Sequence, residues 1–456
     1  MEVKEQNSWD VLRDYLESEN FEALNDYLAA LSGEESIRAL MRLSSEEQKQ
    51  ILAAVSPESA ADVFDFIPDE SAGELLGELN PEVAASIVSE MSSDDQADLL
   101  AELDEEDLEE VLRFMDQRDA GEARELMAYD EDVAGGLMMK EYFSYPRSFG
   151  ARAVLNDLSQ REDEYDLNHV QYIYVTGHSG KLQGVVRIRD IIFASPSTRL
   201  SAILLPALSV NVQTKLDELE DFFDEHTMTA VPVVDDEGLM LGVVRRRAVY
   251  DAVAEHAEAD HLKSQGIVGG EELRSMPTLV RSRRRLSWLS VNILLNVIAA
   301  SVIAQFQDVL SAVIILAVFL PIISDMSGCS GNQAVAVSMR ELSLGVIKPA
   351  DFYYVWRKEA VVGLINGCAL GLLIAAVAWA WQGNGWLGLV VGAALFVNTL
   401  IAVSIGGTVP VVLKKLNVDP AVASGPILTT ITDMCGFFLL LGTASLMLPL
   451  LTGSAA

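Results

Sequence analysis

The segment RSRRRLSWLSVNILLNVIAASVIAQF, residues 281–306, decides the fold class of this chain. Arginines precede an apolar run of about 20 residues, the length that a transmembrane helix needs. The segment also divides the chain by charge: residues 1–270 hold 58 acidic and 21 basic residues, whereas residues 271–456 hold 9 and 11. A strongly acidic block, which attracts cations, therefore precedes a block of membrane character.

The membrane block contains four further apolar stretches, and we expect all five to cross the membrane as helices. They lie at about residues 287–306, 309–337, 359–382, 385–413 and 421–451. Basic residues occupy every second loop, as Arg340 and Lys348 before the third stretch and Lys414 before the fifth illustrate. This alternation predicts a multi-pass protein of the cell (inner or plasma) membrane, surrounded by lipid, with cytoplasmic N-terminal domains and the C-terminus outside.

Two carboxylates lie inside these apolar stretches, where an ionisable side chain is costly and is usually functional. Asp433 stands in ILTTITDMCGFFLLL (427–441), which contains no basic residue, so a water-filled pore and a passing cation explain it best. Asp325 stands in the second stretch. It could equally be a structural partner of a backbone amide.

Helix-disrupting residues surround Asp325. Pro321, Gly328 and Gly331 predict a break in the second helix that frees backbone carbonyls, and Asn332 follows with an amide oxygen. Carbonyl, amide and carboxylate oxygens are hard ligands that suit Mg²⁺ or Ca²⁺ better than soft metals. Alternatively, Asn332 holds two helices together, since amides often bond across helices in membranes.

The acidic block begins with short helical units. Between residues 40 and 128 they recur every 11–12 residues, and each opens with a capping residue followed by proline or an acid, as in Ser56-Pro57-Glu58 and Asn80-Pro81-Glu82. This pattern predicts a solenoid-like stack of short helices, in which most acids are caps or solvated faces.

A second repeat follows, with a period of 58 residues. Residues 173–192 align with residues 231–250, and each copy predicts helix, strand, turn, strand and helix. The pair resembles tandem CBS domains, a cytosolic sensor module. CBS domains that bind adenosine nucleotides often carry an Asp after the second strand; Asp190 has this place in the first copy, but Ala248 stands in the second, so a bound nucleotide is doubtful.

Three further motifs connect these parts. They are YDEDVAGGLM (129–138), the segment from Pro321 to Gln333 with its sequel to Leu342, and residues 416–424 running on to Thr432-Asp433. With these motifs the chain resembles MgtE-type magnesium transporters over nearly its full length. The resemblance implies a multidomain α + α/β membrane protein: a helical acidic N domain (1–128), a first CBS repeat (129–200), a second CBS repeat (201–261), a connecting or plug helix (262–285) and a five-span pore domain (286–456).

The resemblance also implies a function for individual residues. Such proteins are homodimers that import Mg²⁺ down its electrochemical gradient through a pore on the two-fold axis. Asp433 matches the pore carboxylate that holds a hydrated ion, Thr429 a backbone-carbonyl site and Asn332 the helix-break segment, with Asp325 beside it. Cytosolic Mg²⁺ closes the pore by bridging acids of the soluble domains. Residues at matching regulatory positions are Asp94, Asp98, Asp62 and Asp217, with Gly136 as a backbone ligand.

Two departures from the family pattern bear on this function. The second CBS copy carries Arg245-Arg246-Arg247-Ala248 where the family usually has acids, and these arginines would repel Mg²⁺ or replace it with salt bridges. Our hypothesis is that gating by Mg²⁺ is weakened or rewired. In the pore segment Cys329 replaces a usual Asn and Asp325 replaces a small residue, which leaves the selectivity among divalent ions open. The alternative function is a CBS-regulated transporter of other divalent cations such as Mn²⁺ or Co²⁺, or a cation exporter.

Other classes of protein are excluded by what the sequence lacks. It contains no hydrolase triad, phosphate-binding loop or zinc-ligand spacing, so we do not expect an enzyme. It has no basic patch of the kind that binds nucleic acid. The three cysteines lie in the apolar half and imply no disulfide framework. The opening MEVKEQNSWDVL has no apolar run typical of a signal peptide.

Overall fold

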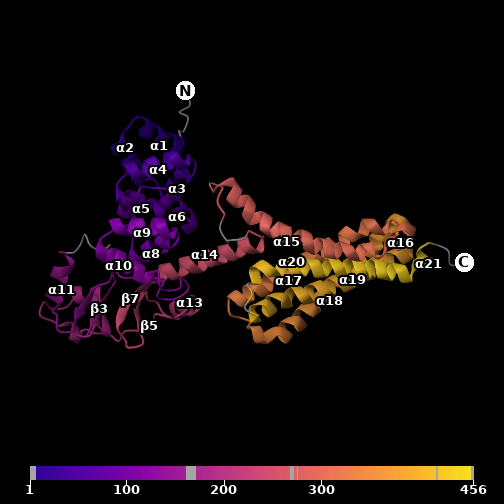
Figure 1. The fold of residues 1–456 in the computed structure, drawn as a ribbon. Coiled ribbons are helices and arrows are strands. Elements are labelled where there is room, and N and C mark those ends of the chain that lie inside the picture. The colour runs from indigo at the N-terminus through magenta and orange to yellow at the C-terminus, as the bar shows by residue number, and fades with distance from the viewer. Residues whose placement is uncertain are drawn as a thin grey trace, which may run out of the picture. The chain divides into compact units, whose positions relative to one another are not determined.

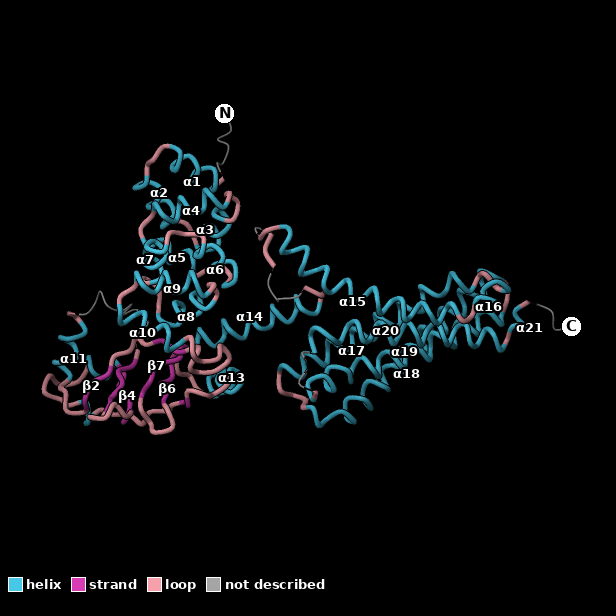
Figure 2. The backbone as a smooth tube through the Cα atoms, in the orientation of Figure 1, coloured by secondary structure: helices cyan, strands magenta, loops and turns pink. Residues whose placement is uncertain are grey.

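The computed structural model describes residues 7–160, 171–267, 272–274, 276–416, 418 and 420–452. The chain divides into two compact units, Met1–His256 with Leu273–Ser275, and Ala257–Glu272 with Met276–Ala456. Among the described residues, strands occur in the first unit, whereas the second is helical (Figures 1 and 2).

Short helices build the first part of unit 1. They are α1 (Ser8–Glu17), α2 (Phe21–Ala30), α3 (Gly33–Leu40), α4 (Ser45–Ala54), α5 (Pro57–Phe64), α6 (Asp69–Gly77), α7 (Pro81–Val88), α8 (Ser93–Ala101), α9 (Glu105–Phe114) and α10 (Gln117–Leu126). The predicted caps are present at Ser56 and Asn80, whose side chains accept hydrogen bonds from the backbone of α5 and α7. Several helices pack against the second helix that follows them in the chain, such as α5 against α7 and α7 against α9.

Glu47 joins two of these helices and provides a test of their stability. It completes a capping box with Ser44 at the start of α4, and its Oε1 accepts a hydrogen bond of 2.6 Å from Arg13 Nε of α1. These hydrogen bonds, chiefly that from Arg13, lower the pKa of Glu47 to about 2. Its stabilising effect is therefore complete above its ordinary pKa of 4.5 and is lost as the pH falls through 2.

We expect Glu47→Ala to reduce the free energy of unfolding by about 1–2 kcal/mol, since it removes a cap and a partly exposed ion pair. Thermal unfolding at neutral pH of the full chain in detergent measures this. Glu46→Ala is the control, because Glu46 is exposed and accepts only a local hydrogen bond from Gln50 in the described chain. Equal melting temperatures for the two variants would contradict the assignment.

The second part of unit 1 contains two small sheets. One has the order β1 (Met138–Met139), β7 (Met240–Arg245), β6 (Ala230–Val234), β5 (Val210–Asn211); the other has the order β2 (Ser144–Pro146), β3 (Tyr172–Thr176), β4 (Leu182–Arg187). Helices α11 (Ala151–Leu158), α12 (Ile188–Ile192) and α13 (Leu216–Glu225), and the 3₁₀ helix η3 (Leu200–Ala202), accompany them.

The predicted repeat is confirmed by these sheets. Hairpin β3–β4 turns through Gly180 and hairpin β6–β7 through Gly238, with φ angles of +74° and +81° that favour glycine. Gly184 and Gly242 also correspond: an added Cβ would lie 2.6 Å from the carbonyl oxygen of Leu205 and 2.8 Å from that of Met139. Each copy therefore needs glycine at the same two places.

The predicted connecting helix over 262–285 is not one continuous helix in the structure. Helix α14 spans Arg246–Ser264, and the next helix, α15, spans Thr278–Ala304. Gly266 stops α14 with a φ of +84°, and Pro277 caps the start of α15. Residues 268–271 and 275 lie outside the described chain. The second CBS copy thus ends in a helix directly after β7, as the repeat predicts, and the segment that connects it to unit 2 is not a single helix.

Unit 2 is a bundle of long helices. After α15 come α16 (Gln307–Ala312), α17 (Leu316–Ser343), η4 (Pro349–Asp351), α18 (Phe352–Gln382), α19 (Gly385–Lys415), α20 (Pro420–Leu446) and α21 (Leu448–Leu451). Four segments are long and apolar enough to span a membrane: 278–304, 349–382, 385–415 and 425–446. Helix α17, at 28 residues, corresponds to the remaining predicted span but is not among these four.

The predicted helix break in α17 is also wrong. The helix continues through Pro321, Gly328 and Gly331 without interruption. A Cβ on Gly331 would lie 2.8 Å from Leu428 Cδ2, and a Cβ on Gly406 of α19 would overlap the carbonyl oxygen of Gly331. Gly331 and Gly406 therefore let α17 pack closely against its neighbours and do not interrupt the helix.

Candidate cation sites

Asp433 lies on α20 and is 8% exposed. Ser324 Oγ of the neighbouring helix α17 donates a hydrogen bond to Asp433 Oδ1. Within the described chain no Lys, Arg or His forms an ion pair with this carboxylate. The predicted pore acid is thus enclosed at membrane depth with a hydroxyl as its partner, which leaves its negative charge available to a cation.

Asn398 of α19 holds the turn of α20 that carries Asp433. The fully buried Asn398 side chain donates from Nδ2 to the carbonyl oxygen of Thr432, 3.1 Å away. Gly436 makes room for it, since a Cβ there would lie 2.7 Å from Asn398 Nδ2. Our set of predicted site residues did not include Asn398. The available signal was an amide in an otherwise apolar stretch, and its partner is visible only in the fold.

The other predicted pore residues do not gather around Asp433 within one copy of the chain. Asp325, Cys329 and Asn332 are exposed and share one face of α17, with spacings of four and three residues. Thr429 is exposed one turn before Asp433, and its carbonyl oxygen accepts a hydrogen bond of 3.0 Å from Thr432 Oγ1. The polar face of α17 is consequently left open on the single chain.

In unit 1, the predicted regulatory acid Asp94 already has a cation. It lies on α8, is 3% exposed, and its Oδ2 lies 2.8 Å from Nη2 of Arg245 on β7. The arginines that the sequence places where acids were expected thus have a structural counterpart, since the guanidinium of Arg245 lies next to Asp94.

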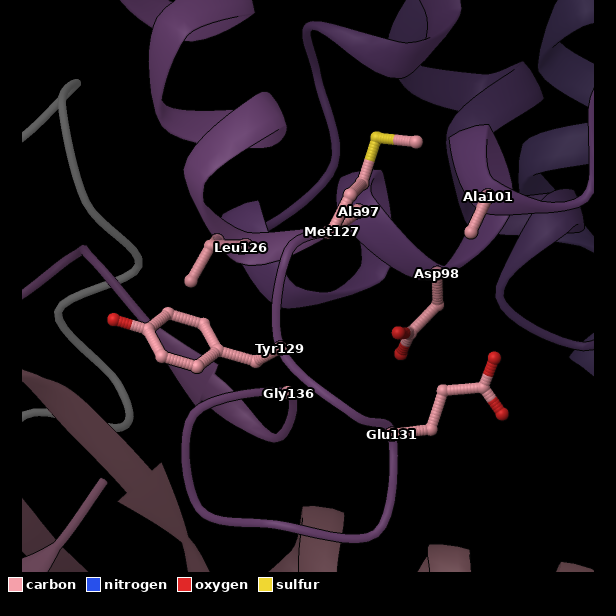
Figure 3. A pocket seen from close by; sticks show the side chains of 8 residues that line it. All are labelled: Ala97, Asp98, Ala101, Leu126, Met127, Tyr129, Glu131 and Gly136. Carbon is pink, nitrogen blue, oxygen red and sulfur yellow. The ribbon is translucent and has the colours of Figure 1, made fainter. Parts of the chain in front are cut away.

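Asp98, one turn further along α8, faces a small pocket of about 40 Å³. Its lining residues are Ala97, Asp98, Ala101, Leu126, Met127, Tyr129, Glu131 and Gly136. Figure 3 shows the carboxylates of Asp98 and Glu131 on the same side of this pocket. A water needs roughly 10–15 Å³, so the pocket can hold a small hydrated ligand.

The electrostatics of this pocket favour a cation. Burial, and then the nearby carboxylates of Asp69, Asp94, Asp95 and Glu131, raise the pKa of Asp98 to about 8. A positive ion would relieve this repulsion. Among the described residues no group of three or more His, Cys, Asp or Glu is arranged to hold a metal. The pocket thus offers the two carboxylates of Asp98 and Glu131.

The remaining predicted sites are separate from this pocket. Asp62 on α5 and Asp217 on α13 are exposed carboxylates, and neither lines it. Asp190, the candidate nucleotide contact, stands in the first turn of α12 with its Oδ1 3.7 Å from Arg189 Nε. Our expectation that the CBS pair binds no adenosine nucleotide stays a prediction.

Three parts of the chain match models of known families. Residues 320–443 match the divalent cation transporter MgtE, residues 31–132 the MgtE intracellular N domain, and residues 202–255 the CBS domain. These ranges cover the helices around Asp433, the short-helix stack and the second sheet copy. The predicted order of parts agrees with all three.

Known proteins are similar to large parts of this chain. The magnesium transporter MgtE of Thermus thermophilus is 33% identical over 336 residues, which are 72% of each chain. A solved soluble part of a magnesium transporter is 26% identical, with a TM-score of 0.50 over 55% of this chain and 98% of that one. The solved cytosolic domain of the Mg²⁺ channel MgtE in complex with ATP is 30% identical, with a TM-score of 0.49 over 53% and 98%. This chain belongs to the MgtE family of magnesium transporters, whose members are not enzymes.

Proposed function

We propose that this chain imports Mg²⁺ down its electrochemical gradient through a pore that two copies form between them. The observation that carries the proposal is Asp433, a carboxylate at membrane depth whose partner is the hydroxyl of Ser324. In this proposal α15, α17, α18, α19 and α20 all span the membrane. The soluble domains lie in the cytoplasm and the C-terminus, whose last residues 453–456 are outside the described chain, lies outside the cell.

A homodimer follows from the open face of α17. Asp325 and Asn332 are exposed there, and polar side chains at this depth are costly against lipid. A second copy across a water-filled passage would cover this face and place two Asp433 carboxylates near one axis. Thr429 would contribute from the preceding turn of α20.

The driving force is electrostatic. An inside-negative potential contributes about 2.3 kcal/mol per unit charge per 100 mV, and about twice that for a divalent ion. Because Mg²⁺ dehydrates reluctantly, we propose that the carboxylates hold the hydrated ion through its water shell. Selectivity against other divalent ions then depends on the size of that shell.

We further propose that cytosolic Mg²⁺ regulates the pore through the soluble domains. Asp98, Glu131 and the backbone of Gly136 are the residues that would hold the regulatory ion, since they surround one pocket of matching charge. Asp62 and Asp217 are secondary candidates. We keep the proposed bounds of 1–128 for the N domain, 129–200 and 201–261 for the two CBS copies, and 262–285 for the connecting segment, which joins the end of α14 to the start of α15.

Uptake in cells that lack their own magnesium transporters tests the proposal. We expect the chain to restore growth at low external Mg²⁺, and we expect excess Mn²⁺ or Co²⁺ to compete weakly. Preferential uptake of Mn²⁺ or Co²⁺ would establish the alternative substrate. Faster loss of Mg²⁺ from preloaded cells would establish an exporter.

A further inference from the structure

Arg245 connects two domains of unit 1. It is the last residue of β7 in the second CBS copy. Its Nη2 lies 2.8 Å from Asp94 Oδ2 and 3.7 Å from Asp95 Oδ2, and both acids are on α8 of the helical domain. The same nitrogen donates a hydrogen bond of 3.3 Å to Ser92 Oγ, just before α8. One guanidinium therefore holds the start of this helix.

The two arginines that follow form hydrogen bonds and an ion pair within their own domain. Arg246 donates from Nε to the carbonyl oxygen of Met228, 2.7 Å away, and lies over the ring of Phe223. Arg247 pairs with Asp251 one turn further along α14, with a side chain that is 81% exposed. Arg247 is consequently a matched control for Arg245: it has the same charge and nearly the same position in sequence, but its ion pair is formed within α14. Its charge reaches the helical domain only as a weaker effect on the pKa of Asp65.

The contact around Arg245 is enclosed. The side chain of Asp94 is 5% exposed and that of Arg245 is 33% exposed. A carboxylate so buried is unstable without a cation or several donors. Ser93 extends the contact, because its Oγ accepts a hydrogen bond from Lys140 N at 2.7 Å and donates one to Glu141 Oε2 at 2.8 Å. Groups of the protein itself thus supply hydrogen bonds across this interface, although Arg245 Nε is buried without a partner among the described residues.

A divalent ion bridging Asp94 to this CBS copy would have to displace the guanidinium. Arg245 Nη2 lies within ion-pair distance of both Asp94 and Asp95, so a second cation between these carboxylates would be repelled by it. Arginine does not lose its proton at physiological pH, which makes this positive charge permanent.

We propose that Arg245 is a built-in cation that docks the helical domain on the second CBS copy without a divalent ion. The consequence for transport rests on the proposed function: the docked state persists when cytosolic Mg²⁺ is low, and the pocket at Asp98 is left to respond to the ion. Docking and regulation are separable, because docking is a property of unit 1 that can be measured without any flux.

The distance between the two domains tests docking directly. Spin labels on Ser86→Cys of α7 and Glu237→Cys of the β6–β7 turn report it in the full chain in detergent, after replacement of the three native cysteines; both label sites are exposed. We expect one narrow distance distribution in EDTA and the same distribution after MgCl₂ is added. Arg247→Ala should leave it unchanged.

Arg245→Ala should broaden the distribution in EDTA, with a docked fraction reduced about tenfold relative to the undocked one, as for loss of a partly buried ion pair. In the Arg245→Asp variant the helical domain should dock on the second CBS copy only when MgCl₂ is present, since carboxylates then lie on both sides of the domain boundary and need a cation between them. A wild-type chain that docks only with MgCl₂, or an Arg245→Ala variant that stays docked in EDTA, overturns the proposal. If Arg245→Ala fails to fold, the wild-type and Arg245→Asp titrations still decide it.

Uptake measured on the same variants distinguishes this proposal from the proposed function. Arg245→Asp should increase the inhibition of uptake by internal Mg²⁺ relative to Arg247→Ala. A chain that shows no uptake but docks in EDTA would refute the transport proposal and leave the role of Arg245 standing. A chain that transports Mg²⁺ but docks only with MgCl₂ would refute the role of Arg245 and leave the transport proposal standing.

Discussion

Asp433→Ala should abolish growth at low external Mg²⁺ and reduce Mg²⁺ uptake at least about 100-fold, since losing about 3 kcal/mol of ion stabilisation has this effect on occupancy. The carboxylate is 8% exposed, with the Ser324 hydroxyl as its partner. In the proposed two-copy pore the substitution removes two negative charges, one from each copy. Uptake of isotopic Mg²⁺ by cells with equal amounts of membrane-inserted protein measures the loss.

Two controls separate the charge from the packing around it. Asp433→Asn keeps the shape and should lose uptake nearly as fully, whereas Asp351→Ala removes a carboxylate that accepts a hydrogen bond from Lys348 N in the loop before α18 and should retain most uptake. Wild-type uptake by Asp433→Asn would show that a hydrogen-bonding side chain suffices there. The negative charge of Asp433 would then not be required for Mg²⁺ uptake, contrary to our proposal.

Gly406→Val should prevent stable packing of the membrane unit. A Cβ on Gly406 would overlap the carbonyl oxygen of Gly331 on α17, and helix backbone cannot yield as a flexible side chain can. Overpacking typically costs about 1–3 kcal/mol, and a clash with backbone lies at or above the upper end of that range. We expect a large fall in melting temperature in detergent and loss of uptake.

Gly442→Val is the matched control, since it also introduces a branched side chain into a long helix of the bundle. Nothing lies within 4 Å of a Cβ added at Gly442 of α20. Its melting temperature should stay close to that of the wild type. Similar losses in both variants would mean that helix propensity, rather than the contact of α17 with α19, explains the effect of the substitution at Gly406.

Local features of the structure were predictable from sequence because local residues cause them. Ser56 and Asn80 cap helices through contacts two or three residues away, and Gly180 and Gly238 turn their hairpins because each adopts a positive φ. The apolar stretches of unit 2 have the length and hydropathy that a membrane requires, independently of their partners. For the same reason Asp433 could be identified as a buried acid before its surroundings were known.

Contacts between distant residues were decided by the tertiary structure. Gly331 could interrupt a helix or admit a neighbour, and the neighbour is Gly406, which the sequence places 75 residues later. The arginines in the second CBS copy predicted altered gating, but nothing in their order indicated that Arg245, and not Arg247, meets Asp94. Caps and turns depend on energies within a few residues, whereas close packing and buried ion pairs depend on which surfaces meet, and only the folded chain fixes that.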